Sequence, residues 1–171
     1  MANYVFTVIS NYFEVKDSQE VAEVLLNLGY EESYCDKSNN TVCLASYENC
    51  WSDEHRVVID RYTKKMVAVI NAYDLDDFEL DDTWISEMEL TEYKLDDLKD
   101  VSITEYIQHQ LVPNSYFAVK EVGNEKLRYN IGYAEVITKN NVKWFNLDML
   151  IETYIAEELS LVDDTEVQLK M

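Results

Sequence analysis

The sequence predicts an α+β fold with antiparallel sheets and about three helices. Segments with strand-like patterns cluster between the predicted helices, and they do not alternate one for one with helices as in a parallel sheet. Hydrophobic residues make up 47% of the 171 residues, which is ample for a buried core. The three helices are expected to begin near Asp17, Ser102 and Leu147.

The chain opens with a predicted strand and a predicted helix. Residues 3–9 are rich in β-branched and aromatic side chains, as strands are. Asp17 and Glu20 then have the spacing of a capping box, and Gly29 is a natural helix end. Between them lies an apolar stripe at helical spacing, formed by Val21, Val24, Leu25 and Leu28.

Two antiparallel strand pairs are expected next. Short strand-like pieces flank residues 38–40, with 41–45 as the second strand, which predicts a hairpin. Residues 56–62 and 66–73 flank the basic turn at 63–65 and predict a second pair. The first half of the chain is therefore read as strand, helix and then a meander of strands.

The second half repeats the mixture of helices and strands. Ser102 and Glu105 form another capping box, and the helix that they begin is expected to end before Pro113. Strands follow at 116–122, 127–138 and 142–145. A last helix is predicted over 147–159, and the alternating residues 165–169 predict an edge strand.

Two packed lobes are the expected organisation, with one compact unit as the alternative. The N-terminal lobe covers residues 1–98 and includes an acidic segment at 71–98, and the C-terminal lobe covers residues 99–171. No linker rich in Gly, Ser or Pro separates them, so the lobes are expected to pack against each other.

The chain is strongly acidic, with 34 acidic and 14 basic residues and a net charge of −20. Thirteen Tyr, five Phe and three Trp are spread along it, so the charge is expected on the outside of a folded body and not on a disordered chain. Such a charge repels nucleic acids and anionic membranes and attracts basic surfaces. A basic protein is therefore the expected partner, and direct nucleic-acid or membrane binding is not.

Cysteine usage and the N-terminus predict a cytoplasmic protein. Cys35, Cys43 and Cys50 are an odd number without the density of a disulfide framework, which favours a reducing compartment. No basic region precedes an apolar run at the N-terminus, and no apolar stretch approaches about 18 residues. Secretion by that route and membrane spanning are not expected.

The acidic charge is concentrated in residues 71–100. This segment has twelve acidic residues and two lysines, so it carries −10, half of the net charge. Apolar residues persist through it, which predicts that the segment is anchored to the fold. They are Leu75, Phe78, Leu80, Trp84, Ile85, Met88, Leu90, Tyr93, Leu95 and Leu98.

Eight acids of this segment are the candidate partner-binding residues. They are Asp74, Asp76, Asp77, Glu79, Asp81, Asp82, Glu87 and Glu89. If residues 74–82 form a strand, Asp77, Glu79 and Asp81 lie on one face about 6.6 Å apart. That spacing matches roughly every second phosphate of a DNA strand, at ~3.4 Å per nucleotide. Carboxylates accept bidentate hydrogen bonds from Arg as phosphates do, so the row can imitate a DNA backbone. The alternative is a solvated acidic loop that keeps the protein soluble.

No metal site or cofactor site is expected. Counted from Asp74, the sixth position of an EF-hand loop is Glu79 where Gly is needed, and the twelfth is Ile85 where a bidentate Glu is needed. Cys43, Cys50 and His55 do not have the paired C-x2-C spacing of a zinc site. Cys35 and Cys43 are expected to be small buried hydrophobic residues in strands.

Catalysis is not expected, and no residue is predicted to be catalytic. Asp82 with Glu92 and Lys94 superficially resembles a metal-dependent phosphodiesterase site, but such a spacing arises by chance in an acidic chain whose field repels the substrate. Cys50 and His55 lack a third positioning group. A Gly-rich phosphate loop, a nucleophile elbow and a dinucleotide fingerprint are all missing from the sequence.

Histidine and tyrosine residues have structural interpretations first. His109 lies one helical turn after Glu105, where it is expected to form a surface pair. Most of the thirteen tyrosines are expected to bury the ring and leave the hydroxyl in water. Tyr73 and Tyr93 lie next to acids and are candidate anchors of an interface.

The chain resembles, in kind, the small acidic inhibitors of bacteriophages and mobile elements: anti-restriction and anti-CRISPR proteins that imitate DNA. The likeness lies in the size, the net charge, the acidic run at 74–82 and the composition, which is rich in Lys, Asn and Tyr and poor in Pro; it covers no alignable motif. It implies a stoichiometric inhibitor that acts in the cytoplasm of a bacterial host and occupies the basic nucleic-acid channel of a host nuclease. The alternatives are an immunity, antitoxin-like or assembly protein with another basic partner, and a metal-dependent nuclease.

Overall fold

A computed structural model describes six ranges of the chain, residues 4–30, 33–47, 51–52, 54–70, 78–125 and 129–146. Within these ranges the fold is α+β, as predicted, with three antiparallel sheets and the helices α1, α2 and α3. The predicted helix at 147–159 and the predicted strand at 165–169 lie outside the described residues.

The largest sheet joins strands from both ends of the chain. Its order is β11-β10-β9-β1-β5, and all neighbours are antiparallel. The strands are β1 Tyr4–Ser10, β5 Ala45–Ser46, β9 Tyr116–Glu125, β10 Tyr129–Thr138 and β11 Val142–Asn146. Because β1 pairs with β9 along its full length, strand pairing crosses the boundary expected between residues 98 and 99. The five-stranded sheet therefore includes residues from both sides of that expected boundary.

Two smaller sheets come from the meander. One has the order β2-β4-β3, and its strands are β2 Phe13–Glu14, β3 Tyr34–Asp36 and β4 Thr41–Cys43. The other has the order β7-β6-β8, and its strands are β6 Arg56–Asp60, β7 Met66–Ile70 and β8 Leu98–Ser102. Both predicted hairpins are therefore confirmed.

The predicted strand at 41–45 is wrong in one respect, because it divides between two sheets. The backbone leaves β4 after Cys43 and enters β5 at Ala45, so Leu44 lies at the corner. Leu44 is fully buried there, and its backbone exchanges hydrogen bonds with Ser10, whose hydroxyl accepts from the Leu44 N–H at 2.8 Å. Tertiary burial of Leu44 thus overrides the continuous strand pattern.

Helices α1 (Ser18–Asn27) and α3 (Ile103–Gln110) begin where the sequence predicts. The Asp17 carboxylate accepts hydrogen bonds from the N–H groups of Gln19 and Glu20, and the Ser102 hydroxyl accepts from the Glu105 N–H. Gly29 has φ 87° after α1, a left-handed conformation that glycine adopts at little cost. Both N-terminal caps and the helix end at Gly29 are confirmed.

The glutamates of the two predicted capping boxes have other partners. One oxygen of Glu20 accepts from the Met66 N–H at 3.0 Å, the Tyr106 hydroxyl at 2.8 Å and the Gln110 amide at 3.3 Å. This carboxylate therefore links α1 to β7 and α3. Burial and the neighbouring Glu20 carboxylate raise the pKa of Tyr106 far above its usual value, so its hydroxyl stays protonated as the donor.

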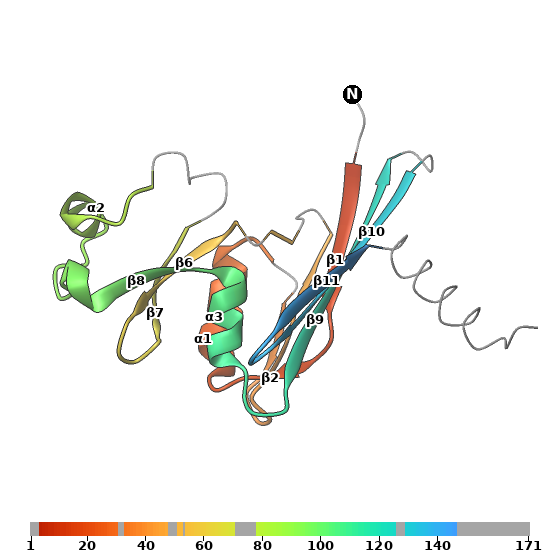
Figure 1. Ribbon diagram of the computed structural model, residues 1–171, viewed down its shortest axis with the longest axis horizontal. Helices are drawn as coiled ribbons and strands as arrows, with labels where there is room; N and C mark the ends of the chain where they lie inside the picture. Colours follow the sequence, from red (N-terminus) through yellow and green to blue (C-terminus); the bar gives the residue numbers. More distant parts are fainter. Residues whose placement is uncertain are drawn as a thin grey trace, which may run out of the picture.

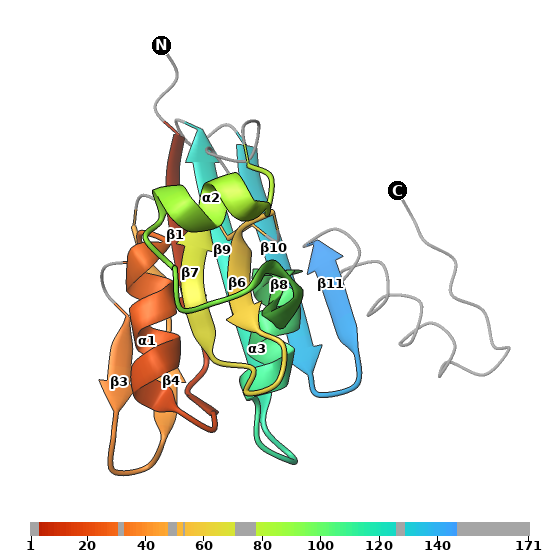
Figure 2. The same cartoon turned by 90° about the vertical axis from the view of Figure 1, so that its left-hand side faces the viewer.

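The elements form layers, which Figure 1 shows edge on and Figure 2 shows after a quarter turn. The helices α1 and α3 lie between the five-stranded sheet and the β7-β6-β8 sheet. The main core fills the space around them, and Phe13, Trp51 and Phe117 pack there ring against ring. A second, smaller cluster lies on the opposite side of the β7-β6-β8 sheet, below α2 (Asp82–Glu87).

Candidate functional site

The acidic segment forms a cap over the outer side of the β7-β6-β8 sheet. We define the acidic cap as residues 78–97, which include α2 and a short 3₁₀ turn at Leu95–Asp97. It has eight acidic residues and one basic residue, Lys94, so its net charge is −7. Figure 1 places α2 at the end of the molecule that is opposite the five-stranded sheet.

Apolar side chains anchor the acidic cap to the sheet. Ile85 is buried against Val58, Ala68, Ile70 and Leu98. Other apolar residues of the cap pack partly buried around this cluster, and they are Phe78, Leu80, Trp84, Leu90, Tyr93 and Leu95. Anchoring of the acidic segment, which the sequence predicted from the interleaved apolar residues, is confirmed for the described part.

Local hydrogen bonds begin and end the helix of the cap. The Asp81 carboxylate accepts from the Trp84 N–H at 2.7 Å and forms the N-cap of α2. After the helix, the N–H of Leu90 donates to the carbonyl of Ile85 at 2.9 Å, and Glu89 has φ 56° in the left-handed region. Asp81 therefore has a structural role that the sequence analysis did not assign to it.

The strand row that could imitate phosphates is not formed in the described residues. Residues 78–80 lie in neither a helix nor a strand, and Asp81 and Asp82 begin α2. The physical reason is that Asp81 caps a helix whose apolar residue Ile85 must reach the sheet. The acids therefore follow a helix and its turns.

The eight predicted partner-binding residues divide into three groups. Asp74, Asp76 and Asp77 lie outside the described residues. Asp81 is partly buried as the N-cap. Glu79, Asp82, Glu87 and Glu89 are exposed on the cap, where they can meet a partner.

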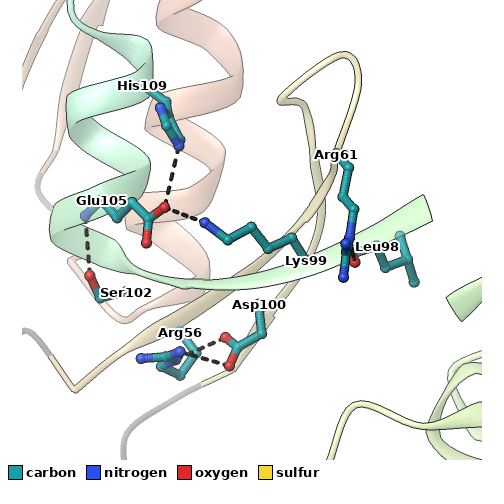
Figure 3. Close-up of polar contacts among 8 residues, drawn as sticks. All are labelled: Arg56, Arg61, Leu98, Lys99, Asp100, Ser102, Glu105 and His109. Atoms are coloured by element: carbon teal, nitrogen blue, oxygen red, sulfur yellow. Dashed lines mark hydrogen bonds and ion pairs between the residues drawn. The ribbon is translucent and has the colours of Figure 1, made fainter. Parts of the chain in front are cut away.

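Three ion pairs involve residues of β6, β8 and α3 (Figure 3): one joins β6 to β8, one joins β8 to α3, and one lies within α3. The guanidinium of Arg56 binds the Asp100 carboxylate through Nε at 2.8 Å and Nη2 at 2.7 Å. The Lys99 ammonium donates to Glu105, and His109 Nε2 lies 3.5 Å from the same carboxylate, which confirms the predicted His109 pair. Arg61 Nε donates to the Leu98 carbonyl.

These contacts occupy Arg56, Arg61 and Lys99, which come from β6, from the turn that follows it and from β8. Hydrogen bonding to the Asp100 carboxylate raises the pKa of Arg56, so the guanidinium is charged at neutral pH. Burial alone would raise the pKa of Glu105, but Lys99 and His109 bring it below its usual value. Within the described ranges, no ion pair includes an acid of the cap. The cap thus presents carboxylates whose charge the neighbouring residues do not neutralise.

The described part of the chain contains no group of three or more potential metal ligands. Cys50 lies outside the described residues, so the trio of Cys43, Cys50 and His55 is not described as a whole. Cys43 is buried, and burial raises the pKa of its thiol. His55 is also buried, and burial lowers the pKa of its imidazole, although the Glu54 charge acts in the opposite direction.

Asp82, Glu92 and Lys94, the residues of the nuclease interpretation, are all exposed, and they belong to two different local elements. Asp82 lies in the first turn of α2, whereas Glu92 and Lys94 lie in the turn that precedes the 3₁₀ helix. No hydrogen bond or ion pair between these three side chains is found in the part of the chain that is described. Tyr93 packs into the anchoring cluster, and Tyr73 lies outside the described residues.

Sequence reasoning missed a carboxylate pair on the inner face of the large sheet. Glu121 accepts from the backbone N–H of Trp51 at 2.9 Å, and Glu135 accepts from the indole N–H of the same residue at 2.6 Å. Burial raises the pKa of Glu121, and the Trp51 N–H only partly offsets this. Strand alternation was the available signal, because Val119 and Ile137 flank the pair on the same face and are fully buried.

A hollow lined by exposed tyrosines was missed as well. Tyr12 and Tyr116 contribute to its wall and are 64% and 51% exposed. The sequence contained no signal for this, because the two residues are far apart in the chain and only the fold brings them together.

Comparison with protein-family models, with curated proteins and with solved structures found no match to this chain. Its function is therefore inferred from its own residues. No helix in the described ranges is long and apolar enough to span a membrane.

Proposed function

We propose that the protein is a stoichiometric inhibitor, active in the cytoplasm of a bacterial host, that binds the basic nucleic-acid-binding surface of a host nuclease. The partner is a CRISPR effector or a restriction enzyme, and the acidic cap stands in for its nucleic acid. The observation that carries this proposal is the surplus of carboxylates on the cap. Eight acids accompany one lysine there, and the neighbouring cations Arg56 and Lys99 are paired with Asp100 and Glu105.

The chemistry of the cap suits a partner rich in arginine. Carboxylates accept bidentate hydrogen bonds from guanidinium groups, as phosphate groups do. The predicted interface consists of the exposed acids Glu79, Asp82, Glu87 and Glu89. The predicted set also includes Asp81 at the helix start. Its other members, Asp74, Asp76 and Asp77, precede the acidic cap in the chain and lie outside the described residues.

Electrostatics sets the salt dependence of this binding. A net charge of −20 steers a basic partner toward the protein and accelerates encounter. Charges at the rim of an interface are screened over about 10 Å at 0.1 M salt. The affinity is therefore expected to fall steeply as salt rises, mainly through a slower association rate.

The test compares two variants with equal net charge. In one, Glu87 and Glu89 on the cap become Gln; in the other, the exposed residues Glu23 and Glu54 outside the cap become Gln. Asp81 is left intact because it caps α2. Using a partner captured from the host, we expect the cap variant to bind roughly tenfold more weakly and the control to bind within about twofold of the parent chain.

Competition with DNA decides the kind of binding. Saturating protein is expected to displace DNA from the captured partner. A partner that still binds DNA normally under saturation refutes mimicry and supports the immunity, antitoxin-like or assembly alternative. Equal losses in the two charge-matched variants refute a localised interface. Divalent-dependent cleavage of DNA by the protein alone refutes the binder proposal as a whole and supports the nuclease alternative.

A further inference from the structure

The exposed tyrosines line a preformed hollow that is separate from the acidic cap. Its volume is about 320 Å³, and it lies between the turn that joins β1 to β2 and the turn that leads into β9. Figure 1 shows these two turns side by side at the lower end of the molecule, away from α2. The residues that matter for its chemistry are Asn11, Tyr12, Glu14, Ser115 and Tyr116.

Hydrogen bonds between the two turns fix the shape of the hollow. The Asn11 side-chain amide donates to the Tyr116 carbonyl at 3.0 Å, and its oxygen accepts from the Ala118 N–H at 2.7 Å. The Ser115 hydroxyl accepts from the Glu14 N–H at 2.9 Å. These bonds join segments about a hundred residues apart in the chain, so the walls are held without a ligand.

Aromatic surface in the hollow is open to solvent. Tyr12 and Tyr116 are both more than half exposed. Tyr34, which is 56% exposed, packs its ring edge against Tyr12 with the ring centroids 6.2 Å apart and so supports that wall. Exposed aromatic rings of this kind are a frequent feature of binding surfaces, because they provide apolar area at little conformational cost.

The charge of the hollow selects a cation. Glu14 lines it and is exposed, and its carboxylate has no hydrogen bond or ion pair among the described residues. The nearest lysine in the sequence, Lys16, donates to the His109 carbonyl instead. A guanidinium group is planar, so it stacks on tyrosine faces and binds a carboxylate with two hydrogen bonds. An ammonium group carries the same charge but lacks the planar shape.

We propose that this hollow binds an arginine side chain, with the guanidinium stacked on Tyr12 and Tyr116 and paired with Glu14. Its assignment to an arginine of the host nuclease rests on the proposed function above. The chemistry of the hollow does not depend on that function, and the hollow is tested with the isolated chain.

The experiment is an NMR titration of the full chain with three capped tripeptides of the sequence Gly-X-Gly, in which X is arginine, lysine or citrulline. The arginine peptide is expected to shift the amide signals of Tyr12, Glu14, Ser115 and Tyr116 to saturation. Lysine is expected to bind about two- to fivefold more weakly, because it lacks the planar stack. Citrulline has the shape of arginine without its charge and is expected to leave these signals in place.

Matched variants locate the binding. Tyr12→Leu keeps an apolar side chain but removes the ring, and Glu14→Gln removes the charge; each is expected to weaken the arginine peptide about two- to fivefold. Glu23→Gln removes one exposed charge that lies outside both the hollow and the acidic cap and is expected to leave binding of the arginine peptide unchanged. Shifts that spread equally over residues 78–97, or equal binding of citrulline, overturn the proposal. Failure of nuclease binding, by contrast, refutes only the proposed function.

Discussion

The acidic cap and the five-stranded sheet lie at opposite ends of the layered structure and differ in how they are held (Figure 1). The sheet combines strands from three parts of the chain, which are residues 4–10, residues 45–46 and the strands β9 to β11, and it covers the main core. The cap is one continuous segment, and it meets the body through a small apolar cluster around Ile85. A net charge of −7, out of −20 for the whole chain, is therefore carried on an element that lies outside the main core.

The two ends also differ in charge. On the outer face of the five-stranded sheet, Lys120 and Lys143 stand among apolar residues such as Ile9 and Val122, and none of the described side chains on this face is acidic. The cap has the opposite composition, with eight acids and one lysine. Self-repulsion among the acids is therefore concentrated away from the sheet, where it costs the main core little.

The largest effect is expected from truncating the main core. Phe117 is fully buried and packs edge to face with Phe13, with the ring centroids 4.8 Å apart. Phe117→Ala is expected to lower the free energy of unfolding by about 3–5 kcal/mol, through lost burial and the cavity that remains. Denaturant unfolding measures this change.

A second phenylalanine of the same sheet is the control. Phe145 lies on the outer face and is only partly buried, with the Lys143 ammonium 4.9 Å from its ring centre. Phe145→Ala is expected to cost clearly less than Phe117→Ala. Equal losses would contradict the distinction between a packed inner face and an open outer face.

A smaller and local effect is expected in the cap. Ile85→Ala removes its central anchor and is expected to cost about 2 kcal/mol, at the lower end of such truncations because the cluster is small. Hydrogen exchange should accelerate at the N–H groups of Met88 and Leu90, which depend on α2, and remain unchanged at Val119 in β9. Equal acceleration at Val119 would show that the cap does not open separately from the body.

The starts of α1 and α3 could be predicted from the sequence, because a capping motif spans only a few neighbouring residues. Asp17 and Ser102 cap their helices as predicted, because the capping oxygen and the N–H groups that it accepts from are at most three residues apart. The glutamates of the same motifs could not be assigned, because Glu20 and Glu105 bind partners from other elements. Local pattern therefore predicted where each helix begins and the contact of Glu105 with His109, but not the contacts of these glutamates with other elements.

The candidate site was predictable only in part, for the same reason. The interleaving of acids and apolar residues correctly indicated an anchored acidic segment. It did not show that Asp81 caps a helix, which removes that residue from any phosphate-like row. The hollow near Tyr12 depends on tertiary hydrogen bonds to Tyr116 and Ser115, and no sequence pattern reports those.

Removing the helix cap is expected to have a smaller effect than removing the anchor. Asp81→Ala deletes the acceptor of the Trp84 N–H. It is expected to lower the free energy of local unfolding of the acidic cap by about 1 kcal/mol. Asp81→Asn removes the same charge but keeps a capping oxygen, so it is expected to stay near the parent chain. Hydrogen exchange at Met88 distinguishes the two variants. An equal effect of Asn and Ala would assign the role of Asp81 to its charge and not to its hydrogen bond.

The smallest expected effect is a pH-dependent one at the inner face of the sheet. Burial raises the pKa of Glu121 above its ordinary value of 4.5 in the folded chain, so the folded state favours the protonated form more than the unfolded state does. The ionised carboxylate therefore lowers the free energy of unfolding as pH rises from the unfolded pKa through the folded one. Glu121→Gln has no such ionisation, and its amide oxygen can still accept from the Trp51 N–H.

This difference predicts how the variant and the parent chain diverge. The free energies of unfolding of the two proteins should be similar near pH 4, and Glu121→Gln should become the more stable of the two toward pH 7. The neighbouring Glu135, which accepts from the Trp51 indole, is unchanged in both, so the comparison isolates Glu121. A variant that is less stable than the parent at pH 7 would show that the charge of Glu121 strengthens its bond to Trp51 by more than burial costs. The ionised carboxylate of Glu121 would then stabilise the fold. The acids of the acidic cap differ from it, because none of them is in an ion pair among the described residues.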